Sequence, residues 1–388
     1  MCIRDRLCGG PAEGCGKLQP GDRIVSVDGK SVEGSSFRHV LDVMRGPEGS
    51  STTLGIARKD SLNRIQHLQV PLKRKKIALD DKRVDVSTQR YGDGVIGRIT
   101  LHSFYEGGDG VSSEKDIRKA ITDLQKNDVL HGIVLDMRDN TGGFLSQAIK
   151  VSGLFIKNGV VVISKYSDGE IKYYRVLDSD RLYDGPLVVL VSKGSASATE
   201  IVAQTLQDYG VAIVVGDEKT YGKGTIQHQT VTDVGSNAFF KVTVGRYYTP
   251  SGKSTQGDGV ISDIVVPTSL HYTEIGENFL DFPLEADCVE AAFNDPLSDI
   301  DPFARRWFSK YYTPTLQERE TRWTTHLTLL KKNSEERIAQ NKNYQHFLQS
   351  IKDKVDSTST TIEMNDLQIE ESINIIKDMI YFDTNSRY

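Results

Sequence analysis

The stretch VLVSKGSASATEIVAQTLQDYGVAIVVGDEKTYGKGTIQ, residues 189–227, contains two apolar runs separated by a segment of helical period. The run at 187–191 predicts a buried strand, and apolar residues then recur at helical spacing from 198 to 206. A second run, 211–215, predicts another strand before a glycine-flanked loop. The stretch therefore predicts a strand, a sharp turn, a helix, a strand and a loop, in that order.

Two reactive side chains lie in the turns of this stretch. Ser197 comes at the start of the predicted helix, and Lys223 lies between two glycines, four residues before Gln227. Ser197 and Glu200 also form the S-x-x-E pattern of a capping box, which helix stability alone explains. However, small neighbours would let a substrate backbone approach Ser197, and the N–H groups at the helix start would stabilise a developing oxyanion. The combination indicates a serine and a lysine presented from adjacent loops.

The segments GSASATEI, QDYG and YGKGTIQ, with DMRDNTGG upstream of them, resemble the C-terminal processing peptidases, and within these the tail-specific protease branch. The resemblance implies an α/β (α+β) protein with a PDZ domain, a mixed-sheet serine protease core and a helical C-terminal domain. Thr199 stands where a third serine is common, and Lys219 is an additional residue in the loop before the lysine. Neither difference removes a reactive group.

The resemblance also assigns roles to individual residues. Ser197 would be the nucleophile, Lys223 the general base, and Gln227 the residue that orients the lysine amine. The residues that would complete the site are Gly143 and Ala198, as backbone donors of the oxyanion hole, with Gly142 and Asp208 in support. No metal or organic cofactor is implied. We therefore expect a serine endopeptidase that cleaves proteins recognised by apolar C-terminal tails.

The remaining sequence divides into three parts. Residues 1–75 contain GKLQPGDRIVSVDGKSVEG and resemble a PDZ domain, a module that pairs a peptide with a sheet edge and captures its terminal carboxylate. Because MCIRDR joins no recognisable element, we expect a truncated PDZ domain with an artefactual start, which would discriminate poorly between free and amidated C-termini. Residues 76–268 are expected to form the peptidase core. Residues 269–388 have many charges and a helical period, and we expect a helical domain packed on the core or, alternatively, a partner-binding arm.

The composition excludes several classes of protein. With 388 residues, a formal charge of −5 and 26% charged residues, the chain lacks the basic field that nucleic-acid binding requires. No apolar run approaches the roughly 20 residues of a membrane helix, and the N-terminus lacks the apolar centre of a signal peptide. The cysteines have neither C-x-x-C nor zinc-site spacing. The resemblance alone implies a periplasmic location, or one on the outer face of the inner membrane, and an adaptor or lipoprotein partner.

Three other functions compete with this one. A Ser-His-Asp hydrolase would use His228 or His131, but no G-x-S-x-G elbow surrounds Ser197. A phosphate loop in GDEKTYGKGT would have one residue too many, and Gly224 stands where a Ser or Thr should follow the lysine. A PDZ scaffold that binds proteins and has an impaired peptidase core is the third, although the serine, lysine and glutamine are all present.

Overall fold

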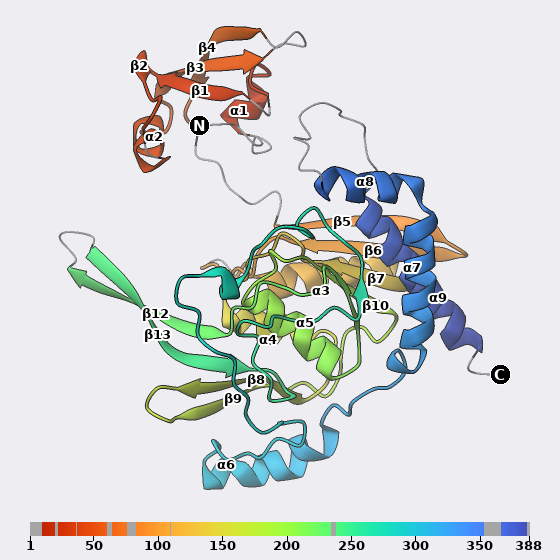
Figure 1. Cartoon of the computed structure of the whole chain (residues 1–388). Helices are drawn as coiled ribbons and strands as arrows, with labels where there is room; N and C mark the ends of the chain where they lie inside the picture. Colours follow the sequence, from red (N-terminus) through yellow and green to blue (C-terminus); the bar gives the residue numbers. More distant parts are fainter. Residues whose placement is uncertain are drawn as a thin grey trace. The chain divides into compact units, whose positions relative to one another are not determined.

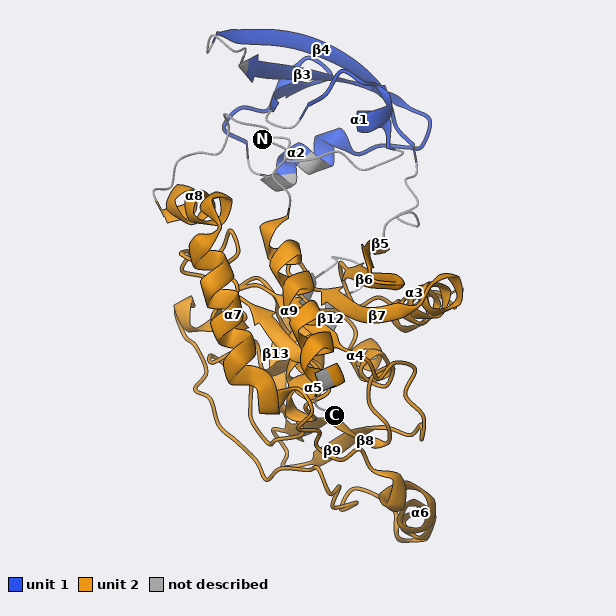
Figure 2. Ribbon diagram, turned by 90° about the vertical axis from the view of Figure 1, so that its right-hand side faces the viewer, with its two compact units in different colours: residues 1–82, 358–360 blue, residues 83–357, 361–388 orange. Residues whose placement is uncertain are grey.

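The computed structural model of the chain (Figure 1) describes residues 10–19, 22–35, 37–59, 64–75, 83–108, 110–233, 238–352 and 366–385. The chain forms two compact units, shown in different colours in Figure 2. The N-terminal unit contains residues 1–82 and 358–360, and the C-terminal unit contains residues 83–357 and 361–388. The predicted artefactual start, MCIRDR, lies outside the described residues.

The N-terminal unit is a small antiparallel sheet with two helices. Its elements are α1 (Pro11–Gly14), β1 (Arg23–Val27), β2 (Lys30–Ser31), α2 (Phe37–Met44), β3 (Ser51–Lys59) and β4 (Ile65–Lys73). The strand order is β2-β1-β3-β4. Asp28 and Gly29, the predicted tight turn, both have positive φ and connect β1 to β2. Leu18, Ile24 and Ile56 are among the buried side chains of its core.

A six-stranded sheet with the order β14-β11-β10-β7-β6-β5 forms the centre of the C-terminal unit. Its strands are β5 (Val84–Tyr91), β6 (Gly94–Leu101), β7 (Leu130–Asp136), β10 (Leu187–Val191), β11 (Ile213–Gly216) and β14 (Ile264–Val265). Neighbouring strands are parallel from β6 to β14, and β5 pairs antiparallel with β6. The carboxyl ends of the parallel strands therefore lie along one edge, where the connecting turns can meet.

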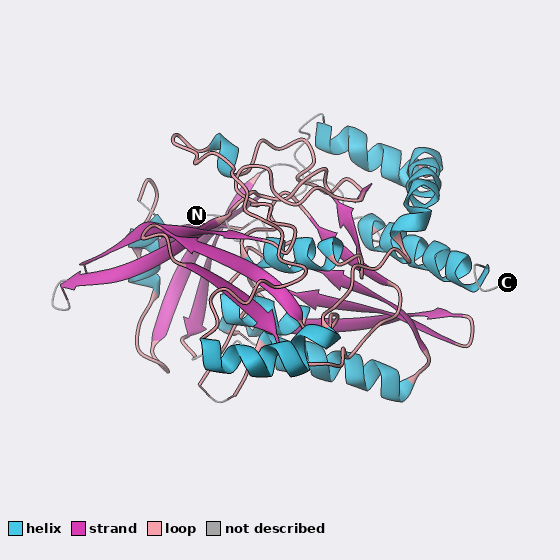
Figure 3. Cartoon of the chain, turned by 90° about the horizontal axis from the view of Figure 1, so that it is seen from below, coloured by secondary structure: helices cyan, strands magenta, loops and turns pink. Residues whose placement is uncertain are grey.

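Helices cover both faces of this sheet, and its strands run between them in Figure 3. The helices are α3 (Ser113–Asn127), α4 (Leu145–Ser152), α5 (Ala198–Asp208), α7 (Leu327–Gln340) and α9 (Leu367–Asn385). Successive residues of β7 alternate between the faces, because Ile133 and Leu135 pack with α3, α4 and α5 while Val134 packs with α7 and α9. Burial on both faces explains why the strands are continuous apolar runs in the sequence.

A second, antiparallel sheet has the order β12-β13-β8-β9. Its strands are β8 (Gly159–Tyr166), β9 (Ile171–Val176), β12 (Thr225–Asp233) and β13 (Ala238–Tyr248). The hairpin of β12 and β13 projects from the rest of the unit in Figure 1. Its base lies next to the loop that carries Lys223, because β12 begins directly after Lys223 and Gly224.

The C-terminal extension is mainly helical after residue 301. Residues 268–301 are mostly irregular, and ion pairs of Arg175 with Asp295 and Asp299, each at 2.6 Å, attach them to β9. The later elements include α6 (Pro302–Trp307), α8 (Lys342–Lys352), α7 and α9. Helices α7 and α9 pack on the central sheet, so the extension is part of the core and not a free arm. None of the described helices is long and apolar enough to cross a membrane.

The contact between α9 and β7 provides a test of this packing. Ile376 is fully buried, and a Cβ atom on Gly132 of β7 would lie 2.3 Å from its Cγ2 atom. We expect Ile376→Ala to lower the free energy of unfolding of the C-terminal unit by about 2 to 5 kcal/mol, because the deletion leaves a cavity between helix and sheet. Urea unfolding followed by tryptophan fluorescence measures this, since Trp307 and Trp323 both lie in this unit.

The matched control is Tyr381→Ala on the same helix, where the side chain is 63% exposed. It should change the free energy of unfolding by no more than about 0.5 kcal/mol. Equal losses from the two substitutions would contradict the docking of α9 on β7.

Candidate active site

The turn between β10 and α5 holds Ser197 in an unusual backbone conformation. Its φ is +60° and its ψ is −116°, outside the extended region that capping residues normally adopt. Such a conformation costs a residue with a side chain about 1 to 3 kcal/mol. Of the three neighbouring hydroxyl residues, Ser195 and Thr199 are fully buried, whereas Ser197 is partly exposed. The geometry thus presents one of the three hydroxyls to solvent.

The two buried hydroxyls attach this turn to the segment after β7. The Ser195 hydroxyl donates to the carbonyl of Met137 at 2.9 Å, and the Thr199 hydroxyl donates to the carbonyl of Asn140 at 2.9 Å. Their role is therefore to position the turn.

Glu200 has a larger role than the capping-box pattern suggested. Its side chain is fully buried, and one carboxylate oxygen, Oε2, accepts the backbone N–H of Ser197 at 2.8 Å and that of Lys223 at 2.9 Å. The other oxygen, Oε1, accepts the N–H of Gly222 at 2.7 Å and the hydroxyl of Thr220 at 2.6 Å. One carboxylate thus joins the turn that carries the serine to the loop that carries the lysine.

Burial raises the pKa of Glu200 to about 7, against the opposing effect of the four hydrogen bonds. A protonated carboxyl would have to donate one hydrogen bond where four donors already point at it. The connection between the two loops is therefore strongest when Glu200 is ionised.

The loop around Lys223 is fixed through its backbone. Beyond the N–H bonded to Glu200, its carbonyl accepts the hydroxyl of Thr255 at 3.2 Å and the phenol of Tyr247. The flanking glycines are needed because a Cβ atom on Gly222 would lie 3.0 Å from the backbone of Gly257. Within the described chain, the Lys223 amine itself has no hydrogen-bond or ion-pair partner. The amine is therefore available to another group.

Tyr247 is a site residue that the sequence did not reveal. It is buried on β13, and its hydroxyl donates to the Lys223 carbonyl. Burial raises its pKa well above the ordinary value, and the nearby charge of Glu200 acts in the same direction. The phenol therefore stays protonated and acts as a neutral donor. A tyrosine pair in a strand carries no motif that would have indicated this role.

The glycine loop after β7 lies against the Ser197 turn. Gly142 and Gly143 have φ values of +105° and +146°, which favour glycine. A Cβ atom on Gly142 would lie 2.9 Å from the Cβ atom of Ser197. The N–H of Gly142 donates to the side chain of Asn140 at 2.9 Å. Among the described residues, the N–H groups of Gly143 and Ala198 have no partner, so both are available to an oxyanion.

Two of the predicted site residues, Gln227 and Asp208, make no hydrogen bond to Ser197 or Lys223 in the described part of the chain. Gln227 lies on β12 next to a bulge in its pairing with β13, and its exposed side chain makes no hydrogen bond to a described residue. Asp208 is the last residue of α5, at the opposite end of the helix from Ser197. Its carboxylate accepts the amide of Gln204 at 2.9 Å and the N–H of Ser251 at 2.9 Å, which is a structural role.

His131 and His228 are the two histidines that a Ser-His-Asp mechanism could use. His131 lies at the start of β7, at the opposite end of that strand from the glycine loop, and contacts Asp93 at 2.8 Å. The side chain of His228 lies outside the described part of the structure. The described residues contain no group of three or more His, Cys, Asp or Glu side chains that could hold a metal ion.

Two family models match separate parts of the sequence. Residues 95–266 match the family model of peptidase family S41, and residues 6–58 match that of the PDZ domain. A carboxy-terminal-processing protease of Bartonella bacilliformis is 37% identical over 264 residues, 67% of this chain and 57% of the relative. A tail-specific protease of Haemophilus influenzae is 31% identical over 304 residues, 75% of this chain and 42% of the relative.

A solved structure, the photosystem II D1 C-terminal processing protease, is 30% identical, with a TM-score of 0.45 and coverage of 69% of this chain and 68% of that chain. The sequence matches define an S41 peptidase core combined with a PDZ domain. The chain is thus similar in sequence to C-terminal processing peptidases, tail-specific proteases among them. It spans about half the length of the curated relatives it matches.

Glu200→Gln tests the connection between the two loops. The substitution keeps the side-chain volume but replaces one acceptor oxygen with an NH₂ group. This group would face N–H or hydroxyl donors, which would lose their acceptor. Each buried donor left without an acceptor costs about 1 to 3 kcal/mol. We expect the rate of peptide cleavage to fall at least about tenfold in a folded protein. The control is Glu218→Gln, an exposed residue close to the same loop, which should keep the wild-type rate.

The titration of Glu200 gives a second expectation. Because its pKa is raised from 4.5 to about 7, the folded protein holds a proton between these values that the unfolded chain has released. The stability that this proton contributes is fully present below about pH 4.5 and is lost as the pH rises through about 7. Glu200→Gln cannot titrate, so its urea midpoint relative to the wild type should rise between pH 5 and pH 8. A constant difference would show that Glu200 ionises normally.

Proposed function

We propose that this chain is a serine endopeptidase that uses Ser197 as nucleophile and Lys223 as general base to cleave proteins recognised by their C-terminal tails. The observation that carries the proposal is the binding of both backbone N–H groups by one oxygen of the buried Glu200 carboxylate. This shared oxygen holds the backbone of a partly exposed serine near that of a lysine whose amine has no partner in the described chain, which supports the proposal.

The proposed reaction follows from the groups present. In the first step, the Lys223 amine accepts the proton of the Ser197 hydroxyl as the oxygen attacks the scissile carbonyl carbon. The N–H groups of Gly143 and Ala198 stabilise the oxyanion that forms. The lysine then gives the proton to the leaving amine, which leaves an acyl-enzyme. Water, deprotonated by the same lysine, attacks the ester and releases the acid, and Ser197 recovers its proton.

Two further residues support the dyad in this proposal. Tyr247 donates to the Lys223 carbonyl and so holds the backbone of the lysine loop. Gln227, exposed on β12 four residues after the lysine, would orient the amine when substrate is bound. Asp208 supports the site at a distance, by fastening the end of α5 to Ser251.

The N-terminal unit would select the substrate. A PDZ domain binds an extended C-terminal peptide at a sheet edge, which suits protein or peptide substrates with apolar tails. A periplasmic location, or one on the outer face of the inner membrane, and an adaptor or lipoprotein partner are part of the proposal and rest on the family alone.

Substitution of the dyad tests the proposed function directly. Ser197→Ala removes the nucleophile, and Lys223→Arg keeps the charge but cannot accept a proton in this pH range. Each should lower the cleavage of a denatured model protein by at least about 10³-fold without unfolding the chain, as judged by mass spectrometry of the products and by circular dichroism.

Matched controls are available for both positions. Lys219→Arg alters the additional lysine of the same loop and should keep the wild-type rate. Ser195→Ala removes positioning hydrogen bonds and should retain far more activity than Ser197→Ala. Full activity in folded Ser197→Ala would refute the nucleophile, and a wild-type rate in Lys223→Arg would refute the base. A wild type that cleaves nothing would favour the alternative, a PDZ scaffold with an impaired peptidase core.

A further inference from the structure

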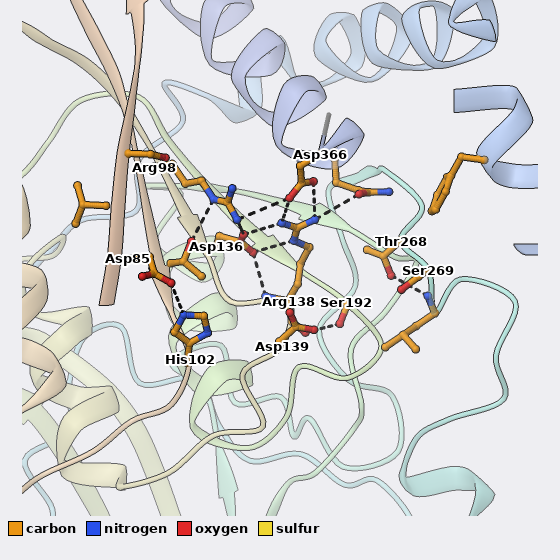
Figure 4. Close-up of a pocket in the computed structure, with 16 residues that line it drawn as sticks. Asp85, Arg98, His102, Asp136, Arg138, Asp139, Ser192, Thr268, Ser269 and Asp366 are labelled. Atoms are coloured by element: carbon orange, nitrogen blue, oxygen red, sulfur yellow. Dashed lines mark hydrogen bonds and ion pairs between the residues drawn. The ribbon is translucent and has the colours of Figure 1, made fainter. Parts of the chain in front are cut away.

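A polar cavity of about 540 Å³ lies where the carboxyl ends of β7 and β10 face the helical extension (Figure 4). Two arginines and two aspartates form an ion-pair cluster on its wall: Arg98, Asp136, Arg138 and Asp366. The first three come from the central sheet and the segment that follows it, and Asp366 directly precedes α9. The cluster therefore joins the extension to the strands that carry the catalytic turns.

The pair of Arg138 with Asp366 has the geometry of a strong contact. Two guanidinium nitrogens donate to the two carboxylate oxygens, at 2.6 and 2.8 Å. The same guanidinium donates to both oxygens of Asp136, at 2.7 and 2.9 Å, and its side chain is only 15% exposed. Bidentate, charge-assisted pairs of this kind fix orientation as well as distance. Burial alone would raise the pKa of Asp366, but the hydrogen bonds from Arg138 lower it, so the carboxylate is charged at neutral pH.

The backbone of Arg138 contacts the catalytic turn. Its carbonyl accepts the hydroxyl of Ser192 at 2.5 Å and, more weakly, that of Ser195 at 3.4 Å. The carbonyl of Ser195 in turn accepts the N–H of Tyr221, in the loop that carries Lys223, at 3.0 Å. Arg138 also lies just before the segment 140–143 that provides the glycine loop. One residue thus binds the extension with its side chain and the Ser197 turn with its backbone.

We propose that Asp366 is a positioning residue for the reaction: through Arg138 it fixes the segment 138–143 against the Ser197 turn, and so holds the oxyanion donors in place. This inference rests on the proposed peptidase function. It assigns the helical extension a direct effect on the catalytic step, exerted through one ion pair between residues 228 positions apart in the sequence. Because the proposed effect of Asp366 reaches the site through Arg138, its loss should affect the transition state and leave substrate binding unchanged.

The same helix offers a matched control. Arg337 of α7 binds Asp378 of α9 at 2.8 Å, and the Asp378 side chain is 22% exposed, compared with 33% for Asp366. Both pairs fasten α9, but the pair of Asp378 connects two helices of the extension and has no link to the segment 138–143. A role in helix docking alone would make the two aspartates equivalent.

The experiment measures kcat and KM for a peptide substrate with the full chain and its Asp366→Asn, Asp366→Glu and Asp378→Asn variants. The affinity for a peptide boronic acid, which forms a tetrahedral anionic adduct with a serine oxygen, is measured in parallel. We expect Asp366→Asn to lower kcat by about tenfold to a hundredfold with KM unchanged, and to weaken boronate binding by a similar factor. Asp366→Glu, which keeps the carboxylate, should recover part of kcat, and Asp378→Asn should match the wild type.

The outcomes separate this inference from the proposed function. A wild-type kcat in Asp366→Asn, an equal loss in Asp378→Asn, or a rise in KM without a change in kcat would overturn the positioning role while the wild type remains an active peptidase. If Asp366→Asn does not fold, Arg138→Lys serves instead, because it keeps the charge and loses the bidentate geometry. It should show the same fall in kcat at constant KM, and a wild-type kcat would overturn the inference. An inactive wild type would overturn both proposals.

Discussion

The buried carboxylate of Glu200 is the interaction on which the arrangement of this site depends. A charged group without water must be satisfied by hydrogen bonds, and here two backbone N–H groups of reactive residues supply part of that requirement. If the two loops separated, the carboxylate would lose hydrogen-bond donors and these donors would lose their acceptor. The shared hydrogen bonds therefore hold the two loops together. The positions of Ser197 and Lys223 are thus set by their backbones, before any contact between their side chains.

The central sheet makes that interaction possible. Because β7, β10 and β11 are parallel neighbours, the segments that follow them leave the sheet at the same edge. The glycine loop follows β7, the Ser197 turn follows β10 and the Lys223 loop follows β11. Each segment also binds the next: Thr199 donates to Asn140, and Tyr221 donates to Ser195. The site is therefore a property of strand order as much as of side chains.

The sequence could predict what is local and could not predict what depends on distant contacts. The apolar runs predicted the strands at 187–191 and 211–215, and helical spacing predicted α5. The capping-box pattern identified the contact between Glu200 and Ser197, but the other three donors lie 20 to 23 residues further along the chain, beyond any local pattern. The same pattern would have given Ser197 an extended backbone, whereas its φ is positive.

The family resemblance extended the prediction to the glycine loop at Gly142 and Gly143. Glycine is required there because a Cβ atom would collide with neighbouring backbone. The resemblance also named Gln227 from its position in the family motif, and a motif position does not show the bulge between β12 and β13 beside this residue. Tyr247 was missed for a related reason: its importance arises only where β13 passes the lysine loop, so neither its neighbours nor its residue type indicate it.

Apolar and ionic contacts have different effects on how the helical extension packs on the sheet. Its apolar face, with Trp323, Leu330 and Ile376 buried on the sheet, supplies most of the attraction, which is roughly proportional to the area removed from water and has little directional preference. Such a face would tolerate small shifts of α9 along the sheet. The bidentate pair of Asp366 with Arg138 tolerates them far less, because two hydrogen bonds at fixed angles define one register. Since Arg138 also binds the Ser197 turn, the register of the helix and the geometry of the site are set by the same residue.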